Sequence, residues 1–293
     1  MKKLRILLKS RYFIYILIIL SLLRICSIIN KKSKIDINNT NFTCVVTNIN
    51  GNKYLLNCGE LLEISIEDNS IKIGDILRIN GELSFYNNNT NFNLFDYKDY
   101  QENRNIFYYL NINSYQRINA SNNIILKIKR FIYDRIYNLK SFDYLNAFIL
   151  GNKSGIDTTL LKKIGILHLF AVSGMHITLL LSLIDKYTNN GRTKKYITII
   201  FLLFYYLIIK SVSLLRCIVF YVFKSINKNI NLGFNKYFEI IISILLIIII
   251  KPNAIYDIGF YYSVILSSGI SILNTKIKVK NKIIKRLIIE VIK

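Results

Sequence analysis

The sequence of 293 residues has no tryptophan, a single proline and only two histidines. No CxxC pair occurs and no histidines and cysteines cluster at metal-ligand spacing, which argues against a zinc site. The glycine-rich G-x-x-x-x-G-K-[ST] loop that cradles nucleotide phosphates is absent as well. We therefore expect a protein that is not an enzyme, uses no cofactor, and obtains any energy it needs from a partner.

Acidic residues are scarce, because 17 aspartates and glutamates stand against 40 lysines and arginines, for a formal net charge of +23. Such an excess favours nucleic acid or anionic lipid as a partner, although membrane topology alone can account for part of it. Hydrophobic residues make up 52% of the chain, and the mean hydropathy is +0.34. A chain this apolar is atypical of a soluble enzyme and predicts an integral membrane protein.

The N-terminal segment, residues 1–30, predicts a first membrane helix. Lysines and arginines crowd residues 1–11, and an apolar run follows over residues 12–29, close to the ~20 residues that a helix needs to cross the hydrocarbon core. A cleaved signal peptide is the alternative, but the run exceeds the usual ~7 to 15 residues and lacks a small-x-small cleavage site. The basic start predicts a cytoplasmic N-terminus, which places the following region outside the cell.

Residues 40–118 are polar, with short segments of alternating apolar residues. The turn residues at Asn50–Asn52 and Gly74–Asp75 separate such segments. About five short strands in this length predict a small, partly open barrel of the OB type, outside the cell. Such barrels can bind single strands by stacking bases on aromatic rings, although core packing explains the same residues. The candidate rings are Phe85, Tyr86, Phe92, Phe95, Tyr97, Tyr108 and Tyr109.

The four cysteines fall into two groups. Cys44 and Cys58 lie on the two strands of the predicted hairpin, in a compartment that permits disulfides. Whether they pair depends on the geometry of the adjacent strands, so both states stay open. Cys26 and Cys217 lie in apolar segments, where cysteine usually acts as a small core residue.

Residues 122–160 predict amphipathic helices at a membrane surface. Over residues 124–142, isoleucine, phenylalanine and tyrosine recur at helical spacing against lysines and arginines. A solvated helix on the folded domain is the alternative for this pattern. Residues 161–275 then contain five apolar segments and predict a transmembrane domain, followed by a basic cytoplasmic tail at 276–293. The loops placed inside carry most of the lysines and arginines, as expected for about six spans.

One apolar segment, which begins at Gly165, holds both histidines of the chain. At about 100° per residue, Ser173 and His176 lie about 60° apart on a helix and His168 about 80° from His176, so all three can share a face. Polar side chains in such a place line a water path or hold helices together. Gly165 and Gly174 permit close helix contact or a break in the helix. Hydrolysis with Ser173 as nucleophile is disfavoured, because no orienting third group is evident.

These residues resemble the signature of the ComEC family of competence proteins, the membrane channel for incoming transforming DNA. The stretch HLFAVSGMH is similar to the family's His-Leu-Leu-Ala-Ile-Ser-Gly-Leu-His core. The segments NLFDYKDYQENRNIFYYLNI, SLLRC and KPNAIYDIGFYYSVIL resemble family segments in the same order, although Tyr261 replaces the usual glutamine. The matching residues around the signature and after it are Gly151, Gly155, Gly165, His168, Ala171, Ser173, Gly174, His176, Arg216, Pro252, Gly259, Phe260 and Ser263.

The resemblance implies a channel component for single-stranded transforming DNA in the cytoplasmic membrane of a bacterium. It implies membrane lipids, a DNA receptor outside and an ATP-driven DNA motor inside as partners. Many family members carry a metallo-β-lactamase-like nuclease domain, but no HxHxDH motif is present, and members usually continue through further helices. A separate chain carrying the missing helices or nuclease and a homo-oligomer are therefore further partners to consider.

The expected fold class is a multi-pass α-helical membrane protein, with an extracellular small β-barrel (OB-like) domain inserted after the first transmembrane helix. Two alternative functions stay open. The first is a truncated or inactive relative of the family without transport activity. The second is a small-solute transporter, which is disfavoured because an external barrel has no evident use there.

Overall fold

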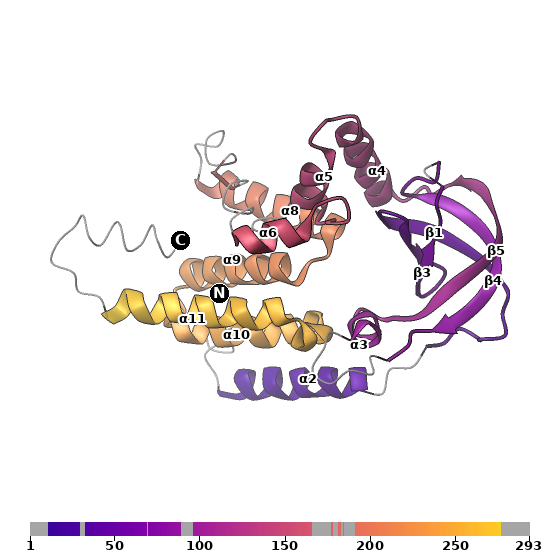
Figure 1. The fold of residues 1–293 in the computed structure, drawn as a ribbon. Coiled ribbons are helices and arrows are strands. Elements are labelled where there is room, and N and C mark those ends of the chain that lie inside the picture. The colour runs from indigo at the N-terminus through magenta and orange to yellow at the C-terminus, as the bar shows by residue number, and fades with distance from the viewer. Residues whose placement is uncertain are drawn as a thin grey trace. The chain divides into compact units, whose positions relative to one another are not determined.

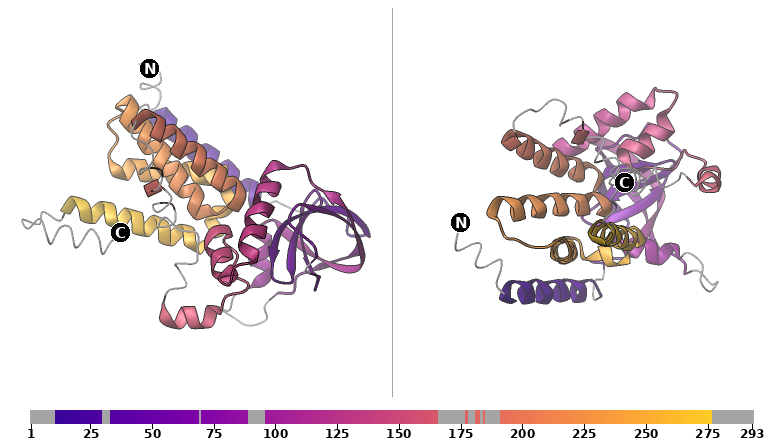
Figure 2. Two further views of the ribbon diagram at one scale, coloured as in Figure 1. Left: turned by 90° about the horizontal axis from the view of Figure 1, so that it is seen from above. Right: turned by 90° about the vertical axis from the view of Figure 1, so that its left-hand side faces the viewer.

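The computed structural model describes residues 11–29, 33–68, 70–88, 96–165, 177, 181–182, 184 and 191–276. The chain divides into two compact units, each described here by itself. Unit 1 comprises Met1–Asn30, Ile184–Leu202 and Ser211–Lys293, and unit 2 comprises Lys31–Leu183 and Leu203–Lys210. Figure 1 labels the helices and strands, and Figure 2 gives two further views of them.

Unit 2 is built on a closed barrel of five strands. They are β1 (Asn41–Asn50), β2 (Lys53–Asn57), β3 (Leu61–Ser65), β4 (Asp75–Phe85) and β5 (Ile106–Ala120). The strand order is β1-β2-β3-β5-β4, in which β3 and β5 run parallel and the other neighbours antiparallel. Figure 1 shows β4 and β5 curving together as long strands. This small barrel agrees loosely with the predicted OB type, which also has five strands.

The barrel core forms because alternate residues of each strand point inward. On β1, Phe42 and Cys44 are buried and the residue between them is exposed, and on β4, Leu77 and Ile79 are fully buried. Cys44 forms a disulfide with Cys58, which directly follows β2. The disulfide therefore links the end of β2 to a core residue of β1.

Helix α4 (Ile124–Tyr137) is fastened to the barrel by two cationic side chains. Arg130 donates to the buried carboxylate of Asp75 at 3.0 Å, and Arg117 of β5 pairs with the same carboxylate. At the neighbouring position, the Lys129 ammonium donates to the carbonyl oxygen of Thr47 at 3.0 Å. These contacts fix one side of α4 against the barrel.

Short helices complete unit 2. They are α3 (Tyr97–Glu102), α5 (Phe142–Leu145), the π-helix η1 (Asn146–Leu150) and α6 (Thr158–Ile164). Asp96 caps α3 and Asp157 caps α6, each by accepting hydrogen bonds from two backbone N–H groups of the first turn. Ile136, Leu150 and Ile208 form a second, smaller core beside the barrel.

The described part of unit 1 consists of helices, of which α2, α9, α11 and η3 contact α10. The helices are α2 (Arg11–Ile29), α8 (Gly191–Ile209), α9 (Val212–Ile230), α10 (Lys236–Ile250), the 3-10 helix η3 (Pro252–Tyr256) and α11 (Ile258–Lys276). The end of α8 groups with unit 2. α10 contacts α2, α9 and α11, and Leu17, Phe223 and Ile242 are buried together there. Arg24 of α2 donates from Nε to the carbonyl oxygen of Ile249 at 3.0 Å.

No helix of the described residues is both long enough and apolar enough to cross a membrane. α10 has 15 residues and extends about 22 Å at ~1.5 Å per residue, short of a hydrocarbon core of ~30 Å. α9 has 19 residues but carries Arg216, Lys224 and Lys228. For the described part of the chain, the prediction of a multi-pass α-helical membrane protein is therefore wrong, whereas its small barrel is present.

Candidate nucleic-acid interface

The structure describes only part of the family signature. Outside the described residues lie His168, Ser173, Gly174 and His176. Within unit 2, at the ends of η1 and α6, lie Gly151 and Gly165. Within unit 1, on α9 and α11, lie Arg216, Gly259 and Ser263. Since α9 contacts α11, these last residues belong to neighbouring helices.

The segment that leads to the signature docks on the barrel. Gly151 ends η1 with a φ of 76°, a left-handed conformation that favours glycine. Asn152, which is 7% exposed, donates from Nδ2 to the carbonyl oxygen of Ile49 on β1. Ser154 lies against the β1–β2 turn. A Cβ atom added to Gly51 in this turn would lie 3.5 Å from the Cβ of Ser154. The barrel therefore positions the start of this segment.

Four tyrosines, which we call the tyrosine cluster, gather on the barrel at α3. The ring centroids of Tyr86 and Tyr97 are 5.6 Å apart, and those of Tyr86 and Tyr109 are 6.5 Å apart. Tyr100 joins them at 6.3 Å from Tyr97. These separations are typical of edge-to-face and tilted ring pairs. The cluster combines rings from the end of β4, from α3 and from β5.

The remaining candidate rings have different surroundings. Tyr108 is buried in the barrel core, so packing accounts for it. Phe85 is 63% exposed at the end of β4, with its ring centroid 5.1 Å from that of Tyr108. Phe92 and Phe95 lie outside the described residues. Phe85 is thus a ring that solvent or a nucleobase can reach.

A buried carboxylate lies beneath the tyrosine cluster, and the sequence patterns did not reveal it. Glu63 of β3 is 6% exposed, although its neighbours on the strand fill the core and its own side chain points to the outer face. The Tyr97 hydroxyl donates to this carboxylate at 2.8 Å, and Gln101 Nε2 donates to it as well. Lys53 of β2 forms an ion pair with it at 3.1 Å. The sequence signal that could have indicated this carboxylate is a glutamate placed between two apolar residues of a strand.

Two cations accompany the rings. The Lys53 ammonium lies 4.6 Å from the centroid of the Tyr97 ring, and the Arg104 guanidinium lies 5.2 Å from that of Tyr100. Burial lowers the pKa of Lys53, but its hydrogen bond to Tyr97 and the charge of Glu63 outweigh burial and raise the pKa overall. Burial raises the pKa of the Tyr97 hydroxyl, which therefore stays a neutral donor at pH 7. The site thus offers neutral rings beside fixed positive charges.

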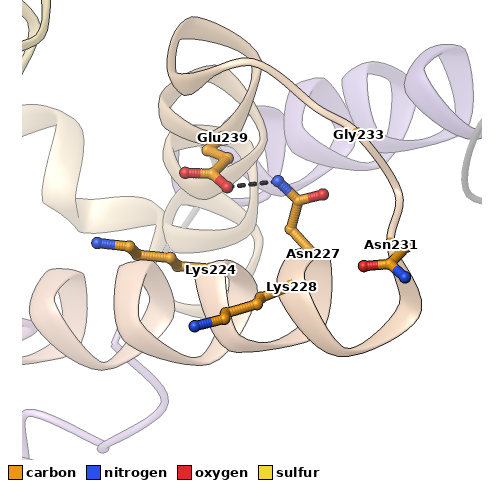
Figure 3. A pocket seen from close by; sticks show the side chains of 6 residues that line it. All are labelled: Lys224, Asn227, Lys228, Asn231, Gly233 and Glu239. Carbon is orange, nitrogen blue, oxygen red and sulfur yellow. Dashed lines mark hydrogen bonds between the residues drawn. The ribbon is translucent and has the colours of Figure 1, made fainter.

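Unit 1 contains an open pocket at the end of α9 (Figure 3). The lining residues are Lys224, Asn227, Lys228, Asn231, Gly233 and Glu239. Asn227 Nδ2 donates to Glu239 at 2.5 Å and to the carbonyl oxygen of Phe234 at 3.1 Å. Figure 3 shows the two lysine side chains extending to one side, away from this pair. The amide and carboxylate hold the α9–α10 connection, which makes the pocket chiefly structural.

The fold and the site together define a small β-barrel with an aromatic and cationic surface, joined to a helical region. Residues 148–292 match the model of the family described as Competence protein. This match supports assigning the chain to the competence family, in agreement with its signature residues. The matched range begins after the last strand of the barrel. Comparisons with curated proteins and with solved structures found no match.

Proposed function

We propose that the chain is a component of the membrane channel that takes up single-stranded DNA during natural competence. The match of residues 148–292 to the Competence protein family carries this proposal, because it supports a role in competence and suggests a membrane-associated one. The barrel adds support, since its own strands carry Tyr109 and Lys53, an aromatic ring and a positive charge that together suit a single strand. The net charge of +23 suits a polyanionic substrate.

Four polar residues line or shape the DNA path in this proposal. A phosphate in a low-dielectric environment is very costly unless polar or cationic groups surround it. Arg216 is half-buried on α9, and an arginine keeps its charge when partly buried. The family signature adds His168, Ser173 and His176 as the other candidates.

A place at the bacterial cytoplasmic membrane is also part of the proposal. Ile124 and Phe131 of α4 are 71% and 58% exposed, and the exposed cations Lys127 and Arg135 lie on the same helix. An exposed apolar face with cations suits an anionic lipid surface. A DNA receptor outside and an ATP-driven motor inside would act together with the channel.

Uptake of labelled DNA tests the proposal. Cells with and without the gene are compared, and uptake is scored as DNA protected from added nuclease. Deletion should abolish protected DNA, and expression of the wild-type chain should restore it. Arg216→Leu should fail to restore uptake at unchanged protein abundance, whereas Arg216→Lys keeps the charge and should restore part of it. Unchanged uptake after deletion would indicate an inactive relative of the family instead.

A further inference from the structure

We propose that α3 is a displaceable cover on the outer face of β2 and β3, and that single-stranded DNA competes with α3 for this face. The covered face consists of Lys53, Leu55, Glu63 and Tyr109. Leu55 lies opposite Glu63 on the neighbouring strand, and Tyr109 lies beside Glu63 on β5. The inference rests on the proposed role in DNA uptake and names the DNA site on the barrel.

The burial of Glu63 is the observation that points to a cover. Side chains alternate along a strand, and Leu62 and Ile64 are both fully buried in the barrel core. Glu63 must therefore point outward, where a carboxylate would ordinarily meet water. Its exposure of 6% results from α3, whose Gln101 is itself only 1% exposed. α3 thus occupies the face on which OB-type barrels receive oligonucleotides.

The contacts that α3 makes with Glu63 and Lys53 are polar and exchangeable, and the Tyr97 ring also packs against Tyr86. Tyr97 and Gln101 both donate to Glu63, and Lys53 donates to the Tyr97 hydroxyl at 3.0 Å. Among the described residues, the members of the barrel's hydrophobic core include none from α3. A helix of six residues is not stable by itself and depends on such contacts. Water or a ligand can replace these hydrogen bonds, so each bond adds a modest net cost to the movement of α3.

The covered face offers what a single strand needs once α3 has moved. Tyr109 and Tyr86 would present ring surfaces on which bases stack, and base stacking on aromatic rings is tolerant of sequence. Lys53, whose side chain is 50% exposed, would remain beside Glu63 and offset its negative charge near the phosphates. These rings favour unpaired bases over a duplex, because stacking requires free base faces.

A binding experiment tests whether α3 competes with single-stranded DNA. The purified full chain is titrated onto a fluorescent thymidine 15-mer, and binding is followed by anisotropy at fixed ionic strength. Tyr97→Phe removes the hydroxyl that binds Glu63 but keeps the ring. It should tighten binding about tenfold, the effect of losing one hydrogen bond to a charged group. Tyr100→Phe is the matched control, since the Tyr100 hydroxyl lies 3.5 Å from Arg104 and not at Glu63.

A second pair of variants separates the possible outcomes. Gln101→Ala should tighten binding as Tyr97→Phe does, and adding Tyr109→Ala should reverse the gain by removing a stacking surface. Equal affinity of wild type, Tyr97→Phe and Gln101→Ala would overturn the cover while leaving DNA binding intact. Absence of binding in every variant would overturn the cover and remove the barrel from the proposed function. Loss of DNA uptake on deletion of the gene would still support the channel role in that case.

Discussion

Replacing Lys129 with methionine should stabilise unit 2 at neutral pH, because this lysine is buried against the barrel with little to compensate its charge. Lys129 is 9% exposed, and its ammonium donates to the carbonyl oxygen of Thr47. Burial, together with the positive charge of Lys210, lowers the pKa of Lys129 from 10.5 to about 8. The folded chain therefore disfavours the protonated lysine.

The size and sign of the effect follow from proton linkage. A decrease from 10.5 to about 8 corresponds to a cost of roughly 3 kcal/mol below pH 8, where both the folded and unfolded chains hold the proton. Between pH 8 and pH 10.5 the unfolded chain binds more protons than the folded one, so the free energy of unfolding rises with pH. Lys129→Met removes this cost but loses a hydrogen bond from a charged donor, worth about 1.5 to 3 kcal/mol, for a net gain of up to about 1.5 kcal/mol at pH 7.

Urea unfolding of the full chain, followed by pulse proteolysis and identification of barrel fragments, measures this free energy at pH 7 to pH 10. The matched control is Lys127→Met on the same helix, where the lysine is exposed and a change within about 0.5 kcal/mol is expected. The wild type should gain stability with rising pH, and Lys129→Met should not. A destabilised Lys129→Met protein together with a flat wild-type profile would refute the reasoning.

Four further predictions concern other positions. Gly81→Ala should destabilise the barrel by more than about 2 kcal/mol in the same assay, because its Cβ would meet the backbone of β5. Gly269→Ala on α11 has open space and should be neutral or stabilising by thermal melting. Asn152→Ala should cost about 1 to 3 kcal/mol, since it leaves the buried Ile49 carbonyl unpaired, and an unchanged midpoint in urea would contradict this contact. Phe131→Ala should weaken sedimentation with anionic vesicles while leaving neutral vesicles and barrel stability unaffected, and equal binding of both proteins would argue against α4 as the lipid surface.

The position of the barrel was predictable from local patterns. The sequence placed it at residues 40–118, and the strands run from Asn41 to Ala120. Alternating apolar residues and turn residues such as Gly51, with a φ of 61°, act over a few residues and need no distant partner. The sequence also placed Cys44 and Cys58 on one hairpin but left their pairing to the geometry, which joins them.

Helix ends explain why the membrane prediction failed in the described residues. Hydropathy identified the apolar run that became α10, but Asn235 caps its start and Pro252 begins η3 just after its end. These local signals limit α10 to 15 residues. The apolar run itself covers only residues 237–250, so its length, rather than its hydropathy, falls short of the ~20 residues that a spanning helix needs.

By itself, the sequence determined the strands and turns of the barrel and the resemblance to the competence family, since periodicity, turn chemistry and motifs are local properties of the chain. Only the tertiary structure decided which polar side chains are buried and what pairs with them. Glu63 meets Gln101 across 38 residues, and Lys129 meets Thr47 across 82. Burial of a charge depends on segments that are far apart in the sequence, so no local pattern could reveal the cover over Glu63 or the cost at Lys129.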